Sequence, residues 1–430
     1  MILIPLLATL ALAGAPHPAL APLDEVYPSL DALYVDLHQH PELSLQEMET
    51  AAKLAARLRA LGYEVTTGVG GNGIVGVLRN GQGPAVLLRT DMDALPVKEE
   101  TGLSFASTVR AKNPAGESVP VMHACGHDVH MASWIGAATL LAKSRDRWRG
   151  TLVLVGQPAE ELVSGARAMI ADGLLTRFPR PDFAVAVHQI PMLPAGQVGV
   201  APGYALAAVD TVEIVVHGRG GHGAAPHHTV DPVLLASRLV VALQGIVARE
   251  VNPLDPAVIT VGSIHGGTKS NIIPDEVKLQ LTVRAYKVDV QKQLLKAIDR
   301  VARGEAAVSG APKEPTVTVI PGGSRSVFND PKLTQRLRPA LTGSLGEAAV
   351  TDFPPIMGSE DFSEFSLAGI PANLFWVGSA APAVFAEARS RDTYPPGNHT
   401  ARMTPDREPT IRTAVATLTL SALELLGKNP

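Results

Sequence analysis

The chain has 430 residues, of which 46% are hydrophobic and 18% are charged, and its formal net charge at pH 7 is -4. A chain of this length can build two or three domains with large apolar cores. The nearly balanced charge shows no basic stripe of the kind that nucleic-acid binders carry, so we expect no nucleic-acid partner. The single cysteine, Cys125, excludes an intramolecular disulfide bond.

The first 21 residues have the length and apolar character of a secretory signal peptide. They end in Ala19-Leu20-Ala21, an A-x-A pattern typical of a cleavage site. Two features are atypical: the segment before the apolar run carries no Lys or Arg, and Pro22 would become the first mature residue. We expect an exported protein, periplasmic or secreted; an uncleaved anchor or a misassigned start are the alternatives.

Residues 22–206 alternate helical and buried-strand patterns. A helix is predicted over 44–62, opened by a capping box of Ser44 and Glu47. The apolar runs at 85–88, 151–155 and 183–187 are continuous rather than alternating, which is typical of strands buried on both faces. These patterns predict a catalytic α/β domain whose sheet is mixed but largely parallel and is flanked by helices.

Residues 207–321 follow a different order, strand-helix-strand-strand-helix-strand. The helices are predicted near 231–250 and 290–304, and the strands near 211–218, 257–267, 277–286 and 315–320. This order is that of a ferredoxin-like α+β domain. The α/β pattern resumes in 322–430, so the small domain is an insertion that divides the catalytic domain into two segments.

Candidate ligands stand directly after the predicted buried strands. Asp91 and Asp93 follow the first apolar run, Glu160 and Glu161 follow the second, and His188 follows the third. Ligands of open α/β sheets bind beyond the carboxyl ends of the strands, where these side chains would meet. Each has a plain alternative: a glutamate pair commonly forms a solvated helix face, and a histidine after a strand is often a satisfied core residue.

Cys125 and His127 are two residues apart, so on one helix they would face different sides. A turn fits them better, with Asp128 as the N-cap of the following helix, and both side chains can then face one cleft. Cys125 alone would be a small core hydrophobe. It is also a candidate nucleophile with His127, although no nucleophile elbow flanks it.

Nine stretches together resemble one known family. They include "LLRTDMDALPVKEETGLSFAS", "MHACGHDVHMA", "GQPAEELVSGARAMI", "GRGGHGAAPHHTVDPV", "GGTKSNIIPDEV" and "NHT", in the order seen in M20 metallopeptidases. They look like the amidohydrolase branch, which includes hippurate hydrolases, N-acyl-amino-acid amidohydrolases and auxin-conjugate hydrolases. The resemblance runs from about Tyr34 to the C-terminus and implies a zinc-exopeptidase-like catalytic domain with an inserted lid and dimerisation domain.

The resemblance implies a centre of two divalent metal ions. Its ligands would be the side chains of Cys125, His127, Glu161, His188 and His399. Glu160 would act as general base and acid. Thiolate, imidazole and carboxylate ligands suit Zn, with Mn, Co or Ni as the other metals. Asp91 and Asp93 stand where most of the wider family has a His-x-Asp motif, and we expect them to orient ligands rather than bind metal.

In the inserted domain, the resemblance implies that His222 reaches the reacting carbonyl of the substrate, often across a dimer interface. Asn271 and Arg284 are candidate contacts to the substrate carboxylate. By themselves these three residues would be a loop histidine, a loop cap and a solvated strand arginine. The resemblance also implies a homodimer through this domain.

We therefore expect a metallo-amidohydrolase that cleaves the amide of a small N-acyl amino acid or a dipeptide-like substrate. The alternatives are an exported dipeptidase or carboxypeptidase of the same family, a cysteine hydrolase using Cys125, and a metal- or solute-binding protein without catalysis.

Overall fold

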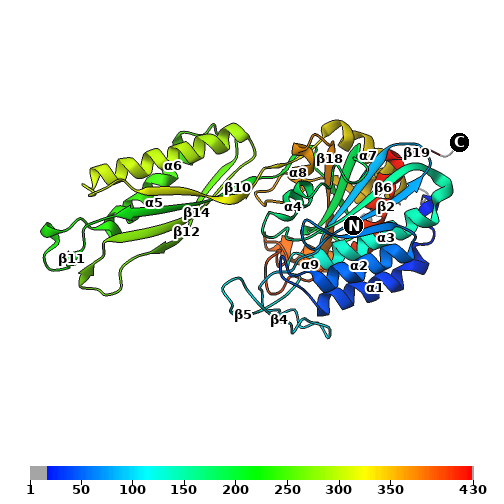
Figure 1. The fold of residues 1–430 in the computed structure, drawn as a ribbon, viewed down its shortest axis with the longest axis horizontal. Helices are drawn as coiled ribbons and strands as arrows, with labels where there is room; N and C mark the ends of the chain where they lie inside the picture. Colours follow the sequence, from blue (N-terminus) through cyan, green and yellow to red (C-terminus); the bar gives the residue numbers. More distant parts are fainter. Residues whose placement is uncertain (1–16, 429–430) are drawn as a thin grey trace, which may run out of the picture. The chain divides into compact units, whose positions relative to one another are not determined.

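The computed structural model describes residues 17–428 and has a mixed α/β architecture (Figure 1). Two compact units are present. The first unit contains the chain up to Gly203, residues 328–354 and the chain from Glu364 onwards, and the second contains 204–327 and 355–363. Most of the expected signal peptide, residues 1–16, lies outside the described residues.

A nine-stranded sheet forms the centre of the first unit. Its order is β1 (Glu64–Val69), β2 (Gly73–Asn80), β6 (Trp148–Gln157), β3 (Ala85–Asp91), β7 (Phe183–Pro194), β18 (Ala372–Ala380), β8 (Val198–Val200) and β17 (Val350–Asp352), with β19 (Gly427–Lys428) paired to β6. The central strands β6, β3, β7 and β18 run parallel. Strands β1 and β2 pair antiparallel with their neighbours, and β8 pairs antiparallel with β18 but parallel with β17. The three predicted apolar runs are the buried strands β3, β6 and β7.

Helix α3 (His127–Lys143) is the most buried helix of this unit. It packs against α1 (Leu23–Gln39), α2 (Met48–Ala60), α10 (Arg407–Leu425) and strand β3. The indole nitrogen of Trp134 donates to the carbonyl of Leu88 on β3, at 3.0 Å. This contact fixes the helix on the sheet, and α3 begins where its first residue, His127, can contact the carboxyl end of β3.

The remaining helices of the first unit are shorter or peripheral. They are α4 (Gly165–Ala171), α7 (Pro331–Leu345), α9 (Pro382–Ser390) and the 3-10 helices at Pro18–Leu20, Arg145–Arg147 and Glu347–Ala349, while α8 (Ser363–Leu367) starts at the boundary of the two units. A small hairpin of β4 (Arg110–Lys112) and β5 (Ser118–Pro120) projects from the loop after β3.

The predicted capping box at Ser44 and Glu47 is wrong. Helix α2 begins at Met48, and the Ser44 hydroxyl donates to Asp93 Oδ2 at 2.6 Å instead of capping the helix. The Glu42 carboxylate takes the capping role, since it accepts the backbone N–H groups of residues 49 and 50. Ser44 and Glu47 are used by long-range contacts that local spacing does not reveal.

The second unit has the ferredoxin-like order. Its elements are β10 (Ala208–His217), α5 (Pro232–Arg249), β12 (Ala257–His265), β14 (Glu276–Ala285), α6 (Val288–Val308) and β15 (Thr316–Ser324). The sheet order is β12-β14-β10-β15, antiparallel throughout, and α5 and α6 cover one face (Figure 1). A separate apolar core lies between these helices and the sheet.

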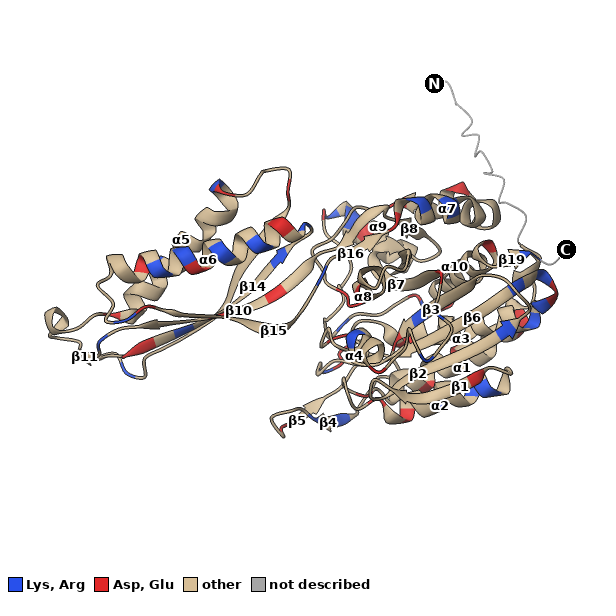
Figure 2. Ribbon diagram, turned by 45° about the horizontal axis from the view of Figure 1, so that its top comes forward, with Lys and Arg blue, Asp and Glu red and all other residues tan. Residues whose placement is uncertain are grey.

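Short strands complete the connections: β9 (Gly203–Leu206), β11 (Gly221–His222), β13 (Ile272–Ile273) and β16 (Val327–Asn329). Within residues 17–428, α5 is the one helix long and apolar enough to cross a membrane, and part of it packs on the sheet. Figure 2 shows Lys and Arg interspersed with Asp and Glu on the helices of both units.

Candidate metal centre

Polar side chains meet at the edge of the first unit where β3 and β6 end, and where β7 continues to Pro194. Asp91 is the last residue of β3 and is paired in register with Gln157, the last residue of β6. Glu160 and Glu161 follow in the loop after β6, and His188 lies in β7. The sheet therefore brings together residues that are almost a hundred positions apart.

Cys125 enters this edge from the turn before α3. Gly126 has φ 82°, a left-handed conformation that favours glycine, and the helix starts at the next residue. Asp128 is thus inside the helix and not its N-cap, and its carboxylate pairs with His38 at 2.7 Å. The turn places the Cys125 sulfur 3.5 Å from His188 Nε2.

The candidate ligand atoms form two groups that share one sulfur. Cys125, His127 and His188 have ligand atoms within 4.8 Å of one another, and so do Cys125, Glu161 and His399. In the second group His399 Nε2 lies 3.4 Å from Glu161 Oε2. All five ligand residues expected from the sequence are therefore brought together, with Cys125 common to both groups.

The two buried histidines each have one nitrogen committed and one available. His127 Nδ1 lies 2.8 Å from the carbonyl of Asp93, and His188 Nδ1 lies 2.7 Å from the carbonyl of Gln189. A carbonyl oxygen only accepts, so both Nδ1 atoms carry a proton, and in the neutral imidazoles both Nε2 atoms offer a lone pair. Among the described residues, the buried His127 Nε2 and Glu161 Oε1 have no hydrogen-bond partner. These atoms fit divalent cations, which would satisfy them.

Asp93 fixes the loop that carries the glutamates. Its two carboxylate oxygens accept the backbone N–H groups of Glu160, at 3.1 Å, and Glu161, at 3.0 Å. Glu47 Oε1 accepts the N–H of Ala159, whose φ of 50° is unusual for a residue with a side chain. The loop is thus held by two buried carboxylates, those of Asp93 and Glu47.

Asp91 is also fully engaged. Its Oδ2 accepts from Arg89 Nη1 at 2.8 Å, and its Oδ1 lies 2.7 Å from His130 Nδ1. His130 Nε2 in turn accepts the backbone N–H of Gln189 at 2.8 Å. Asp91, His127 and His130 also form a compact group, but the hydrogen bonds of Asp91 and His130 leave this a supporting network. Sequence reasoning missed His130, although three residues after His127 on a helix is the same face.

The electrostatics of the cluster favour a cation. Burial raises the pKa of the Cys125 thiol well above its usual range, and the nearby Glu161 raises it further. Burial raises the pKa of Glu161 to about 8, although His127 opposes the shift. Burial also lowers the pKa of His188 well below its usual range, which keeps this imidazole neutral. Without a cation the cluster retains protons that a divalent ion would displace.

The predicted residues of the second unit separate into two places. His222 and Asn271 lie side by side, because β11 and β13 pair and the N–H of Gly223 donates to the Asn271 carbonyl at 2.9 Å. Arg284 lies at the far end of β14, where its Nη1 donates to the Met357 carbonyl at 2.6 Å. Glu276, the first residue of β14, and Arg284 are separated by roughly 26 Å of extended strand.

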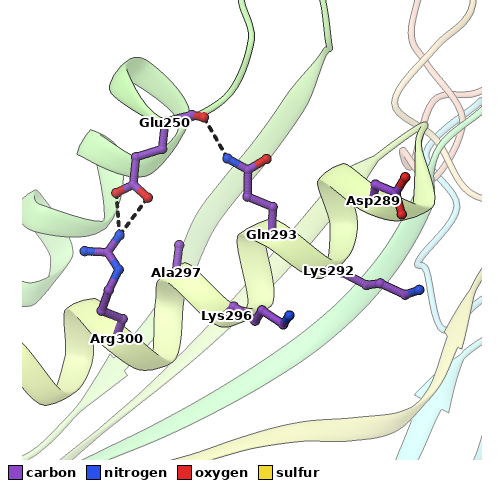
Figure 3. A pocket seen from close by; sticks show the side chains of 7 residues that line it. All are labelled: Glu250, Asp289, Lys292, Gln293, Lys296, Ala297 and Arg300. Atoms are coloured by element: carbon purple, nitrogen blue, oxygen red, sulfur yellow. Dashed lines mark hydrogen bonds and ion pairs between the residues drawn. The ribbon is translucent and has the colours of Figure 1, made fainter.

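A separate hollow of about 470 Å³ lies in the second unit, along α6 (Figure 3). Arg300 is held there by both oxygens of Glu250, and Gln293 donates to the Glu250 carbonyl at 2.7 Å. Lys292 and Lys296 line the same hollow. None of the candidate ligands lines it, so it is not part of the centre.

The chain is similar to known proteins in sequence and in structure. The model of peptidase family M20/M25/M40 matches residues 87–394. Thermostable carboxypeptidase 1 of Saccharolobus solfataricus is 37% identical, over 80% of this chain and 84% of its own. N-acetyl-L-cysteine deacetylase of Bacillus subtilis is 37% identical, over 80% of this chain and 78% of its own. The YXEP protein of Bacillus subtilis, a dinuclear metal binding peptidase from the M20 family, has a TM-score of 0.75 and 30% identity, over 94% of this chain and 100% of its own.

Proposed function

Because the chain belongs to peptidase family M20, we propose that it is a metal-dependent amidohydrolase that cleaves N-acyl amino acids or small dipeptide-like substrates. The observation that carries the proposal is the pair of ligand groups that share Cys125. Similar proteins include a carboxypeptidase and a deacetylase, and both reactions hydrolyse an amide. A panel of N-acyl amino acids and dipeptides would separate an acylase from a dipeptidase.

We propose that the protein would hold two divalent ions, with the Cys125 thiolate as the ligand residue common to both groups. One ion would be held by His127 and His188, and the other by Glu161 and His399. When bound, such ions polarise the amide carbonyl and acidify a water molecule. Zn²⁺ suits this mixture of sulfur, nitrogen and oxygen ligands, with Mn²⁺, Co²⁺ and Ni²⁺ as alternatives.

Glu160 is the group placed to move protons. Its side chain is nearly buried, and Oε2 lies 3.8 Å from His127 Nε2, so it stands beside the ligands. We propose that it accepts the proton of the attacking water and returns it to the leaving amine nitrogen. The His399 side chain is 56% exposed, whereas that of His127 is 0% exposed, so substrate would approach from the His399 side.

The decisive variant is Glu160→Gln. It should keep its metal content and lose roughly 10²- to 10⁴-fold in kcat, because only the proton acceptor is removed. The matched variant Glu161→Gln should lose metal as well as activity. Metal analysis together with amide hydrolysis measures both effects. Normal turnover by Glu160→Gln would show that this residue is not the proton acceptor. Activity that survives exhaustive chelation would show that the reaction does not depend on a metal.

Two other functions would give different results. An acyl group trapped covalently on Cys125 would favour a cysteine hydrolase. Tight binding of metal or solute without hydrolysis of any amide would favour a binding protein.

We also propose a homodimer formed through the second unit. Leu234 and Val241 are 61% and 73% exposed and lie seven residues apart, on one face of α5. The edge strand β12 carries the half-exposed Ile264. The strand length between Asn271 and Arg284 exceeds a small substrate, so one copy cannot offer both to the same molecule. Two copies could each contribute one of them.

Export is proposed from the apolar N-terminal segment. Residues 17–20 pack on the first unit: the N–H of His17 donates to Ser344 Oγ at 2.7 Å, and Ala19 is 1% exposed. A cut after Ala21 would remove these contacts, whereas a cut at the upstream A-x-A pattern, Ala11-Leu12-Ala13, would keep them. We expect the mature N-terminus of the exported protein to precede His17, as measured by intact-mass spectrometry. A mature chain that starts at Pro22 would contradict this.

A further inference from the structure

Two side-chain amides lie against Cys125, and neither was singled out by its sequence. Gln189 follows the candidate ligand His188, and Asn398 precedes the candidate ligand His399. Gln189 Nε2 donates to the carbonyl of Cys125 at 2.7 Å and to Asn398 Oδ1 at 2.7 Å. Asn398 Nδ2 lies 3.7 Å from the Cys125 sulfur.

The backbone carbonyl of Cys125 determines the orientation of both amides. Because this oxygen only accepts, the Gln189 side chain must present its NH₂ group to it. The second hydrogen of that NH₂ group then requires an acceptor, so Asn398 presents its oxygen. The NH₂ group of Asn398 is thereby turned toward the sulfur. The chain of contacts leaves no freedom to exchange the two ends of either amide.

The surrounding backbone makes room for this arrangement. Gln189 is 1% exposed, and a Cβ atom at Gly126 would come within 2.6 Å of its side chain. Asn398 is placed by its neighbour, since the N–H of His399 donates to the carbonyl of Ala124 at 2.8 Å. The glycine before α3 thus serves both the turn and the close approach of the Gln189 amide.

We propose that Gln189 and Asn398 form an amide pair that directs one N–H donor at the Cys125 thiolate and so positions and tunes it as a metal ligand. The inference rests on the proposed metal centre. A thiolate has three lone pairs, so a sulfur that held two ions would retain one for Asn398. A hydrogen bond to this lone pair draws charge from the sulfur, which leaves the bound ions more electrophilic. Both amides are positioning residues, because they contact the ligand and not the substrate.

The test uses the full chain loaded with Co²⁺, whose bond to a thiolate gives a charge-transfer absorption band. A hydrogen bond stabilises the sulfur electrons, so its loss should move this band to longer wavelength. We expect this shift in Asn398→Leu, which has a similar size and no donor, together with a loss of about tenfold in Co²⁺ affinity. Gln189→Met should shift the band in the same direction by a smaller amount, because Asn398 then loses its orientation.

Thr400→Val is the matched control. The Thr400 hydroxyl donates to the Gly397 carbonyl at 2.7 Å, so this variant loosens the same loop without touching the amide pair. Its band should stay at the wild-type wavelength. If Asn398→Leu and Gln189→Met also keep the wild-type band, the amide pair has no role in tuning the sulfur. If the wild-type protein gives no thiolate band at all, Cys125 is not a ligand and the proposed centre fails with the inference.

Discussion

At the scale of single residues, hydrogen bonds within the protein hold the candidate ligands in place without an ion. The carbonyls of Asp93 and Gln189 fix the protonated nitrogen of each buried histidine, and Asp93 also holds the loop of Glu160 and Glu161. Little reorganisation is therefore needed to bind a cation. The cost of assembling these ligands is met during folding, by contacts that do not involve the ligand atoms themselves.

The buried acids predict a pH dependence of metal binding. The Glu161 pKa of about 8 and the elevated pKa of Cys125 mean that both side chains must release protons to become ligands. Protons compete with the ion, so affinity for Zn²⁺ should rise with pH between about 6 and 8, by up to about tenfold per pH unit for each proton displaced. Competition with a chromophoric chelator at several pH values measures this. Affinity that does not vary with pH would contradict it.

A second residue-scale prediction concerns His38. Burial would lower its pKa, but hydrogen bonds to Asp128 and Glu99 raise it to about 10. The folded protein thus keeps a proton that the unfolded chain releases near pH 6.5, so this contribution to stability is complete below pH 6.5 and is lost as the pH rises toward 10. Urea unfolding should show a decreasing free energy of unfolding over that range.

The variant His38→Gln should cost about 3–5 kcal/mol at neutral pH, since it leaves two buried carboxylates without their cation. His40→Gln is the control, because the His40 side chain is 61% exposed and should contribute little. If the His38→Gln variant is as stable as the wild-type protein, His38 does not carry a charge that is paired with Asp128 and Glu99.

At the scale of elements, the sequence predicted best where one pattern decides the structure. Continuous apolar runs identified β3, β6 and β7, and the strand-helix order identified the ferredoxin-like sheet. The start of α2 was predicted wrongly because Ser44 bonds to Asp93, 49 residues away. Asp128 was expected to cap α3 but pairs with His38, 90 residues away. The hydrogen-bond partners of these polar side chains are distant in sequence, and the local spacing of residues does not predict them.

The candidate site shows the same division. The residues of the two candidate ligand groups could be predicted to meet, because they follow recognisable apolar runs or lie in motifs that resemble a family. The roles of three other residues could not be predicted, namely Gln189, Asn398 and His130. The role of an amide or a histidine side chain depends on which atoms it contacts in the folded protein. The contact of Asn398 with Cys125 joins positions 273 residues apart, and only the fold brings these two together.

At the scale of the whole molecule, the second unit is expected to set the oligomeric state. Leu234→Asp and Val241→Asp should each convert a dimer to a monomer, because a buried charge in an apolar contact is costly. Light scattering after gel filtration measures the mass. Val308→Asp is the matched control, since Val308 is 69% exposed near the end of α6. If both α5 variants remain dimers, the dimer interface does not lie on α5.

The order of the ligands along the chain has a consequence for biosynthesis. Cys125, His127, Glu161 and His188 precede the inserted unit, and His399 follows it. At ribosomal rates the last ligand emerges roughly 10 to 40 s after His188. All residues of the group of Cys125, His127 and His188 are therefore synthesised before the inserted unit, whereas the group of Cys125, Glu161 and His399 is complete only near the end of translation. Because β18 and α10, which pack on β7 and α3, are also synthesised after the inserted unit, the complete centre would form only in a finished polypeptide.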